Sequence, residues 1–205
     1  MVQTLYLIRH GEALHNVLFK KMGVKAFRLP MATDAALTYL GQEQSIQLGY
    51  KWEQKSNIEL VLVSPLMRTL ETAMNIFGDT DVKIMAHDFL REYPIGEDTC
   101  NKRSDRSYCK RKFPRIDFTG IAKDRDIDWT EERETMESFE DRIHQMKQYV
   151  NNRSEKKIAI VGHSSYIGKV KDNYISYMEN GDKELLHCHP YEYIVEDTGT
   201  DEKGG

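Results

Sequence analysis

The chain has 205 residues, a formal net charge of -4 and three cysteines. No apolar run approaches the roughly 18 residues of a membrane span, and the slight acidity argues against a dedicated nucleic-acid-binding protein. The odd, low cysteine count favours reduced thiols and a cytoplasmic setting, and the early first strand leaves no room for a signal peptide. At about 150 residues per domain, we expect a single domain over 1–197, with a cap inserted at about 93–130 and a flexible tail over 198–205.

The first predicted strand covers residues 4–8 and ends in Arg9, His10 and Gly11. Its apolar, β-branched and aromatic side chains are typical of a buried strand. In open α/β sheets ligands bind at the carboxyl ends of the strands, so Arg9 and His10 are candidate ligand-binding residues. Gly11 permits a sharp turn and the close approach of a ligand. A strand followed by an ordinary charged turn explains this stretch equally well.

The segment after Gly11 contains a residue that can bind an anion, followed by a helix that we expect to be part of the scaffold. Asn16 can donate an amide hydrogen to an anion beside the strand end, although capping a turn is the commoner use of asparagine. Its neighbour His15 is expected to be a surface or packing residue. Further on, Thr38 is typical of an N-cap and predicts that a helix follows. The apolar residues Leu37, Leu40, Leu48 and Trp52 mark its expected buried face.

A second strand, over residues 60–63, leads into another helix start. Ser64 and Pro65 are typical of an N-cap and a first helical position, which places Arg68 in the first turn. An arginine beside the free backbone N–H groups of a helix start suits a bound phosphate. A third strand, over residues 82–86, precedes Glu92, a carboxylate at the same predicted edge.

Two opposed blocks of charge interrupt the alternation of strands and helices. Residues 101–115 contain seven basic residues against one acid, and residues 117–141 contain ten acids against three basic residues. We interpret these blocks as an insertion over the sheet edge, with Lys102 and Arg103 as substrate-binding residues. The excess of cations predicts a polyanionic phosphorylated substrate, steered by the field of the basic block. Alternatively, the acidic block pairs with the basic block and cancels that field.

Residues 185–195 are predicted to form an edge strand that carries His187, Cys188 and His189. Imidazole and thiolate groups are zinc ligands, so this triplet is a candidate metal site. Alternation along a strand puts both histidines on the face opposite Cys188, and we therefore predict no metal.

Strands that alternate with helices predict an α/β fold, a three-layer α/β/α sandwich with a mainly parallel central sheet. An amphipathic helix from 136 to 150 and a fourth strand over 158–161 complete the pattern, and His163 lies just beyond that strand. The strand ends thus bring together Arg9, His10, Arg68, His163 and Glu92. A cationic pocket with one carboxylate at its rim predicts an anionic ligand, and phosphate fits best.

Three segments carry a family resemblance: residues 7–12, Leu-Ile-Arg-His-Gly-Glu; residues 64–73, which begin Ser-Pro-Leu-Met-Arg-Thr; and residues 161–164, Val-Gly-His-Ser. These motifs, in this order, resemble the histidine phosphatase superfamily, which has the phosphoglycerate-mutase-like fold. Residues 90–92 are similar to the family segment that carries the proton donor. Residues 100–103 resemble an uncharacterised eukaryotic-type subgroup.

The resemblance implies that His10 is the nucleophile and forms a phosphohistidine. It implies that Arg9, Arg68 and His163 hold the phosphoryl oxygens, and that Glu92 protonates the leaving oxygen. Asn16 would add a neutral donor, and Gly11 would lie against the substrate.

The implied activity is hydrolysis of a phosphomonoester, a small phosphorylated metabolite or a phosphopeptide, with no cofactor and no metal. A phosphoglycerate-type mutase is the first alternative, although the mutase loop that follows the acid is not recognisable in residues 93–115. A protein that binds phospholigands without turnover is the second.

Overall fold

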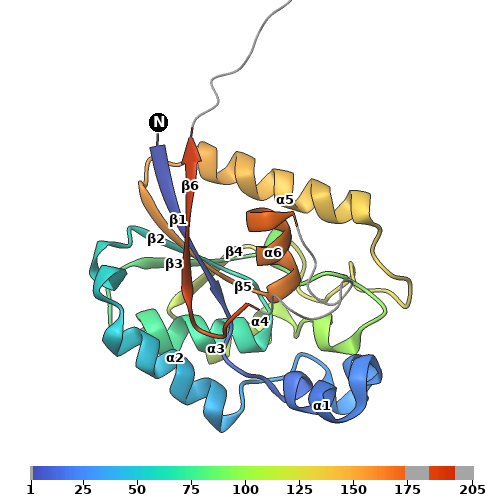
Figure 1. The fold of residues 1–205 in the computed structure, drawn as a ribbon. Helices are drawn as coiled ribbons and strands as arrows, with labels where there is room; N and C mark the ends of the chain where they lie inside the picture. The colour runs from blue at the N-terminus through green and yellow to red at the C-terminus, as the bar shows by residue number, and fades with distance from the viewer. Residues whose placement is uncertain (1, 174–184, 197–205) are drawn as a thin grey trace, which may run out of the picture.

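The computed structural model of the protein describes residues 2–173 and 185–196. Its centre is a six-stranded sheet of order β4-β3-β2-β5-β1-β6, with helices on both faces (Figure 1). The strands are β1 (Val2–Arg9), β2 (Leu60–Val63), β3 (Lys83–His87), β4 (Ile116–Gly120), β5 (Lys157–Gly162) and β6 (Pro190–Glu196). Among the described strands of this sheet, only β6 pairs antiparallel, with β1, so the predicted three-layer α/β fold with a mainly parallel sheet is confirmed.

The helices and short turns connect these strands in chain order. The α-helices are α1 (Leu14–Met22), α2 (Tyr39–Lys51), α3 (Met67–Phe77), α4 (Arg106–Lys112), α5 (Met136–Asn151) and α6 (Ser164–Asp172). The 3-10 turns are η1 (Gly23–Arg28), η2 (Pro30–Ala32), η3 (Glu53–Asn57), η4 (Asp88–Leu90) and η5 (Thr99–Asn101). None of the helices in the described ranges has the length and apolar character needed to cross a membrane.

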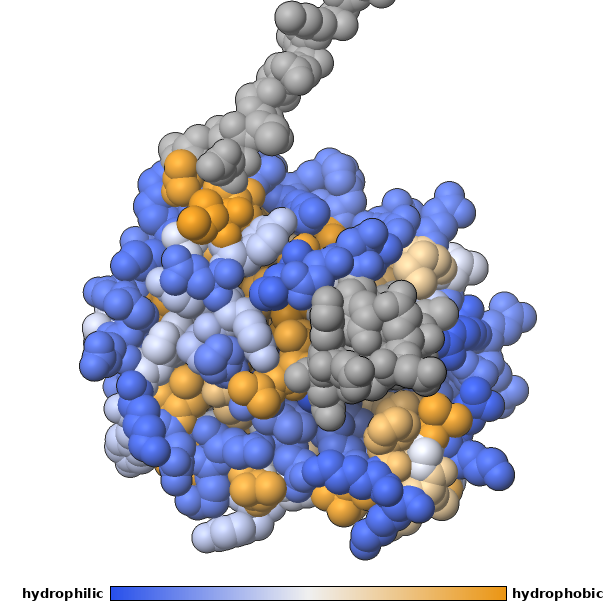
Figure 2. Space-filling model, in the orientation of Figure 1, coloured by the Kyte–Doolittle hydropathy of each residue, from blue (hydrophilic) through white to orange (hydrophobic). Residues whose placement is uncertain are grey.

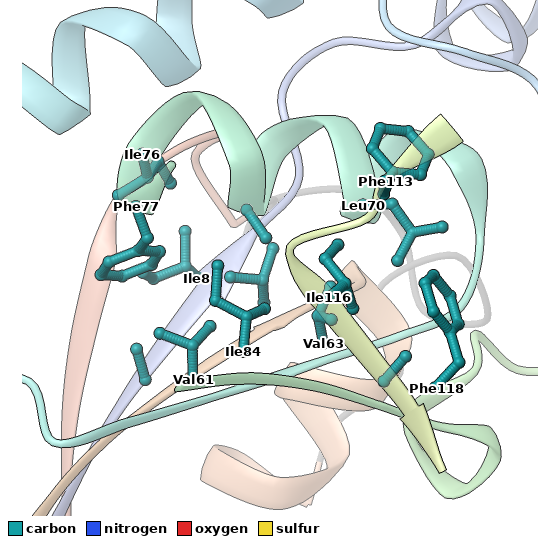
Figure 3. Close-up of a cluster of buried hydrophobic side chains, with 14 of the residues drawn as sticks. Ile8, Val61, Val63, Leu70, Ile76, Phe77, Ile84, Phe113, Ile116 and Phe118 are labelled. Carbon is teal, nitrogen blue, oxygen red and sulfur yellow. The ribbon is translucent and has the colours of Figure 1, made fainter. Parts of the chain in front are cut away.

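Two apolar clusters sandwich the sheet because successive strand side chains point to opposite faces. Ile8, Val61 and Val63 face α3, where Leu70 and Phe77 pack on them (Figure 3). The alternate positions of the same strands face α5 and α6; this second cluster includes Leu5, Leu7, Leu60, Leu62, Phe139, Met146 and Ile167. Burying each such side chain contributes about 2 kcal/mol to stability, so both clusters fix the strand ends relative to one another.

Helix α2 begins where the sequence predicts, and most of its predicted apolar face is in the interior: Leu37 is buried, and Leu48 and Trp52 pack against the first apolar cluster. Thr38 caps it, since its Oγ1 accepts a hydrogen bond from the Gly41 N–H at 3.1 Å. The expected contact of Leu40 is wrong, because this side chain is 52% exposed. The small residues Gly41, Ser45 and Gly49 are buried as well. They let α2 approach α3 and the chain after β1 more closely than leucines would allow.

Two further boundaries differ from the predicted ones. Helix α3 begins at Met67 with Leu66 as its N-cap, so Ser64 is not the cap. Strand β6 begins at Pro190, which leaves residues 185–189 as a loop rather than as part of the strand.

The predicted cap at about 93–130 contains a strand that the sequence analysis missed. Residues 116–120 form β4 and pair with β3 at the sheet edge. Only Ile116 and Phe118 supply a buried alternation there, which is too short a signal amid the surrounding charges. The predicted tail over 198–205 lies outside the described residues.

Candidate active site

The sheet register brings the predicted residues to one edge. Strands β1 and β5 pair so that Arg9 lies opposite Gly162, and His10 and His163 therefore follow on adjacent strand ends. Their rings lie 5.3 Å apart between centroids. Strand β2 borders β5 on its other side and leads through a short turn into Arg68 at the start of α3. The strand ends therefore converge as the sequence predicts.

His10 is buried and held in one tautomer. Its Nδ1 lies 2.7 Å from the carbonyl oxygen of Gly11, which can only accept a hydrogen bond, so Nδ1 carries the proton. The lone pair is therefore on Nε2. Burial, and next the nearby Arg68 guanidinium, hold the pKa of His10 well below its ordinary value. The imidazole is thus neutral at physiological pH, as a nucleophile must be.

Arg68 is fully buried, and the loop after β3 orients it. Its guanidinium donates to the Cys100 carbonyl at 2.7 Å and to Asn101 Oδ1 at 2.9 Å. The Asn101 amide in turn donates to the Pro94 carbonyl. Arg68 Nε is a buried donor without a hydrogen-bond partner in the described part of the chain, so it can donate to a bound anion.

Arg9 projects from the end of β1 toward the loop before β6. Its Nη1 donates to the Leu185 carbonyl at 2.5 Å, and the Arg9 carbonyl accepts from the Cys188 N–H at 2.9 Å. This loop therefore lies directly on the strand end that carries His10.

His163 differs in charge from the expectation. Burial, followed by the Arg68 guanidinium, holds its pKa well below the ordinary value, so the ring is neutral. The cations of the pocket are thus the two arginines, and His163 contributes a neutral hydrogen-bonding group. Its Nε2 pairs with Ser64 Oγ at 2.7 Å. Ser64, which sequence reasoning assigned to a helix cap, instead orients this histidine.

Glu92 lies beyond β3 at the start of α6. Its carboxylate accepts backbone N–H bonds from Tyr93 at 2.8 Å, Tyr166 at 3.1 Å and Ser165 at 3.2 Å. Burial raises the pKa of Glu92 in spite of these bonds, which favour the charged form. A carboxyl group with a raised pKa keeps its proton to higher pH, which suits a general acid.

Two histidines that sequence reasoning set aside lie against His10. The His15 ring, on α1, is buried with its centroid 5.6 Å from that of His10, and the His187 centroid lies at 5.7 Å. His187 Nδ1 also donates to the His10 carbonyl at 2.6 Å. The strand-alternation argument for His187 was wrong because residues 185–189 are a loop. Among the described residues, no three His, Cys, Asp or Glu side chains form a cluster suited to a metal ion.

The predicted substrate-binding residues form two groups: Asn16 and Gly11 lie just after β1, whereas Lys102 and Arg103 lie in the connection between β3 and α5. Asn16 Oδ1 caps α1 by accepting from the Ala13 N–H at 2.9 Å, which leaves its amide hydrogens for an anion. Gly11 packs so tightly on α2 that a Cβ atom would overlap the Gly41 carbonyl. Lys102 lies 4.4 Å above the Trp129 ring as a cation–π contact.

Arg103 has a structural position, contrary to the expectation from the sequence. Its side chain is 1% exposed and bonds to Asp88 and to the carbonyls of Ser104 and residues 123–125. The acidic block also engages the basic block elsewhere, since Asp124 accepts from the Ser107 N–H. The alternative in which the two blocks pair is therefore the better description of this segment.

The chain and its fold have known counterparts. A sequence profile of the histidine phosphatase superfamily (branch 1) matches residues 5–179, and the chain belongs to that superfamily. Phosphoglycerate mutase-like protein 1 of Arabidopsis thaliana is 32% identical over 197 residues, covering 80% of this chain and 69% of the relative. A probable phosphatase of Schizosaccharomyces pombe is 30% identical over 127 residues, covering 60% and 55%.

Solved structures agree on the fold. The ecdysone phosphate phosphatase of Bombix mori, in complex with tungstate, superposes with a TM-score of 0.58 at 19% identity, covering 94% of this chain and 87% of that one. Phosphoserine phosphatase of Entamoeba histolytica, in complex with 3-phosphoglyceric acid, gives 0.55 at 22% identity, covering 93% and 94%. Family and relatives together support an enzyme of the phosphatase or mutase type.

Proposed function

We propose that this protein hydrolyses phosphomonoesters through a phosphohistidine on His10. The observation that carries the proposal is the state of His10: a buried, neutral imidazole whose Nδ1 proton is bound by the Gly11 carbonyl. The lone pair is therefore on Nε2, and the buried guanidinium of Arg68 is close enough to lower the pKa of the ring. A neutral nucleophile next to fixed cations is suited to a dianionic phosphate, because the cations attract the phosphate to the position where the imidazole can attack phosphorus.

In the proposed first step, His10 Nε2 attacks phosphorus and the bond from phosphorus to the ester oxygen breaks. The leaving oxygen takes the proton of Glu92, whose raised pKa keeps that proton available. Water then attacks the phosphohistidine, Glu92 accepts the proton of that water, and His10 is restored. Arg9 and Arg68 neutralise the phosphoryl oxygens, with Asn16 and His163 as neutral donors. Because the side chains supply the neutralising charge, the proposal includes no metal ion.

The experiment replaces His10 and traps the intermediate. His10→Ala should lower turnover of para-nitrophenyl phosphate by about 10³-fold or more, since the nucleophile is lost. An alkaline quench of the parent protein should trap a phosphoryl group that is stable in base and lost in acid. His144→Ala, an exposed histidine on α5, is the matched control and should keep full activity. Undiminished turnover in His10→Ala would refute the mechanism.

A mutase activity is the second candidate, because relatives in Arabidopsis carry the name phosphoglycerate mutase-like. The same phosphohistidine would then return its phosphoryl group to a second hydroxyl instead of to water. Isomerisation of 3-phosphoglycerate, primed with bisphosphoglycerate, would favour the mutase, and release of inorganic phosphate alone favours the hydrolase. Tight phosphate binding without turnover of any phosphomonoester would indicate a binding protein.

We do not extend the proposal to a polyanionic substrate. Of the basic residues in 101–115, several are engaged by protein groups: Arg103 by Asp88, Arg106 by the Ile121 carbonyl, Lys112 by Glu71, and Arg115 by the Thr80 carbonyl. A small phosphorylated metabolite is the substrate class that we retain. If Lys110→Gln and Arg111→Gln together lowered efficiency on polyanions alone, the basic block would regain that role.

A further inference from the structure

Beyond the phosphoryl site, a row of rings leads from His10 toward the protein surface. The His15 centroid lies 5.6 Å from that of His10 and 6.0 Å from that of Phe27. Phe27 and Phe19 then stack in parallel, with centroids 5.1 Å apart and planes at 4°. These rings belong to α1 and η1, which directly follow the strand end that carries His10.

The outer end of this row is open. Phe19 is 39% exposed, and Met22 and Val24, three and five residues further along the chain, are 46% and 59% exposed. In Figure 2, apolar residues lie among hydrophilic ones around α1, at the lower right of the view. An aromatic stack whose last ring is exposed offers a flat surface on which another ring can lie.

The inner end of the row is polar and buried. His15 is 6% exposed, and its Nδ1 has no hydrogen-bond partner within residues 2–173 and 185–196. A buried polar atom without a hydrogen-bond partner is uncommon in proteins. Beside a binding site, such an atom is best explained by a hydrogen bond to a ligand. Ligand sites generally combine such a single polar group with apolar walls.

The row of rings is also hydrogen-bonded, through the main chain of Phe27, to the loop that orients Arg68. Thr99 Oγ1 donates to the Phe27 carbonyl at 3.0 Å and to the Leu29 carbonyl at 2.9 Å. Thr99 begins η5, whose Cys100 and Asn101 hold the Arg68 guanidinium. The aromatic wall and the phosphoryl-binding arginine are therefore fixed relative to each other, as a site that positions both ends of one substrate requires.

We infer that the leaving group of the substrate lies along His15, Phe27 and Phe19, and that the substrate is a phosphomonoester of an apolar, ring-containing alcohol. His15 hydrogen-bonds a polar atom of that group, and the two phenylalanines cover its ring. The inference rests on the proposed function and names its substrate class. It also differs from the polyanionic substrate that the charge pattern of the sequence predicts.

The test compares kcat/KM for 1-naphthyl phosphate, phenyl phosphate and glycerol 1-phosphate. Naphthol and phenol are leaving groups of similar acidity, so a difference between the two aryl esters reports binding of the additional ring. We expect naphthyl phosphate to be favoured over phenyl phosphate by about tenfold, through KM, and glycerol phosphate to be the poorest substrate.

Phe19→Ala should remove most of that preference, because the exposed end of the stack is lost without opening the core. Tyr39→Ala, an 81% exposed aromatic residue on α2, is the matched control and should keep it. Phe27→Leu, which preserves volume, should lower the preference while circular dichroism stays native.

Equal efficiency on the two aryl esters in the parent protein, or an unchanged preference in Phe19→Ala, would overturn the inference and leave the phosphohistidine mechanism intact. The absence of turnover and of a trapped phosphoenzyme with every ester would overturn the proposed function, and this inference with it.

Discussion

At the scale of single residues, burial sets the protonation states that the chemistry needs. The same loss of water lowers the pKa of His10 and raises that of Glu92, so it favours the neutral form of both side chains. Neither direction follows from residue type or spacing. It depends on which atoms surround each group once the strand ends have met.

Glu92→Gln should separate the protonation of the leaving group from the rest of catalysis. Turnover of an alkyl phosphate should fall about 10²-fold or more, and that of para-nitrophenyl phosphate much less, because nitrophenolate leaves without a proton. In the parent protein, alkyl phosphate turnover should decline as pH rises through the raised pKa of Glu92, since the acid form is then lost. Equal losses on both substrates would assign Glu92 another role.

His187 should act by holding the main chain of His10 rather than through its charge. His187→Ala removes the 2.6 Å hydrogen bond to the His10 carbonyl and should lower kcat about tenfold, by loosening the nucleophile. His187→Asn should recover most of that loss, because the asparagine amide can place a donor near the position of Nδ1. If asparagine is no better than alanine, the imidazole ring itself is required.

At the scale of secondary-structure elements, the turn after β1, which contains His10 and Gly11, packs against α2 through a contact between two glycines. Gly11 follows β1, Gly41 lies in the first turn of α2, and a Cβ on either would overlap the other segment. The start of α2 is also hydrogen-bonded to the chain after β1. The Thr38 N–H and Oγ1 both donate to the Glu12 carbonyl. The position of His10 is therefore set by α2 as well as by β1.

Gly41→Ala should accordingly affect both stability and activity. The added methyl would meet the Glu12 carbonyl, and we expect a cost of about 1–3 kcal/mol in the free energy of unfolding, with a clear loss of turnover. Chemical denaturation and para-nitrophenyl phosphate hydrolysis measure the two effects. Gln42→Ala, one residue along on the exposed side of the same helix, should change neither. A fully active, stable Gly41→Ala protein would show that the loop can move without consequence.

At the scale of the whole molecule, a buried ion pair joins the two ends of the long connection between β3 and α5. Arg91 and Asp126 form two parallel bonds of 2.8 and 2.6 Å, with side chains 0% and 2% exposed. The same aspartate accepts from the Arg103 N–H at 2.9 Å. This pair links the acidic block to the residue just before Glu92. The Arg91 guanidinium also donates to the carbonyl of Asn101, whose side chain orients Arg68.

Asp126→Ala should be strongly destabilising, by about 3–5 kcal/mol, because it leaves the Arg91 charge buried without its partner. Denaturation midpoints measure the loss, and proteolysis should begin in residues 101–130. The exposed Asp128→Ala is the matched control, since removing a surface carboxylate changes stability little. Comparable stability of the two variants would mean that the ion pair does not anchor this connection.

The sequence by itself determined the order of the strands other than β4, the helices that follow Thr38, Pro65 and Thr135, and the residues that meet at the strand ends. Apolar runs and amphipathic spacing depend on near neighbours in the chain, and Arg9, His10, Arg68 and His163 follow such runs directly. The tertiary structure alone decided the pairing of Ser64 with His163, the lowered pKa of His10 and of His163, the burial of Arg103 and the approach of His15 and His187. Each of these depends on atoms far apart in sequence and on the exclusion of water between them, neither of which a local pattern records.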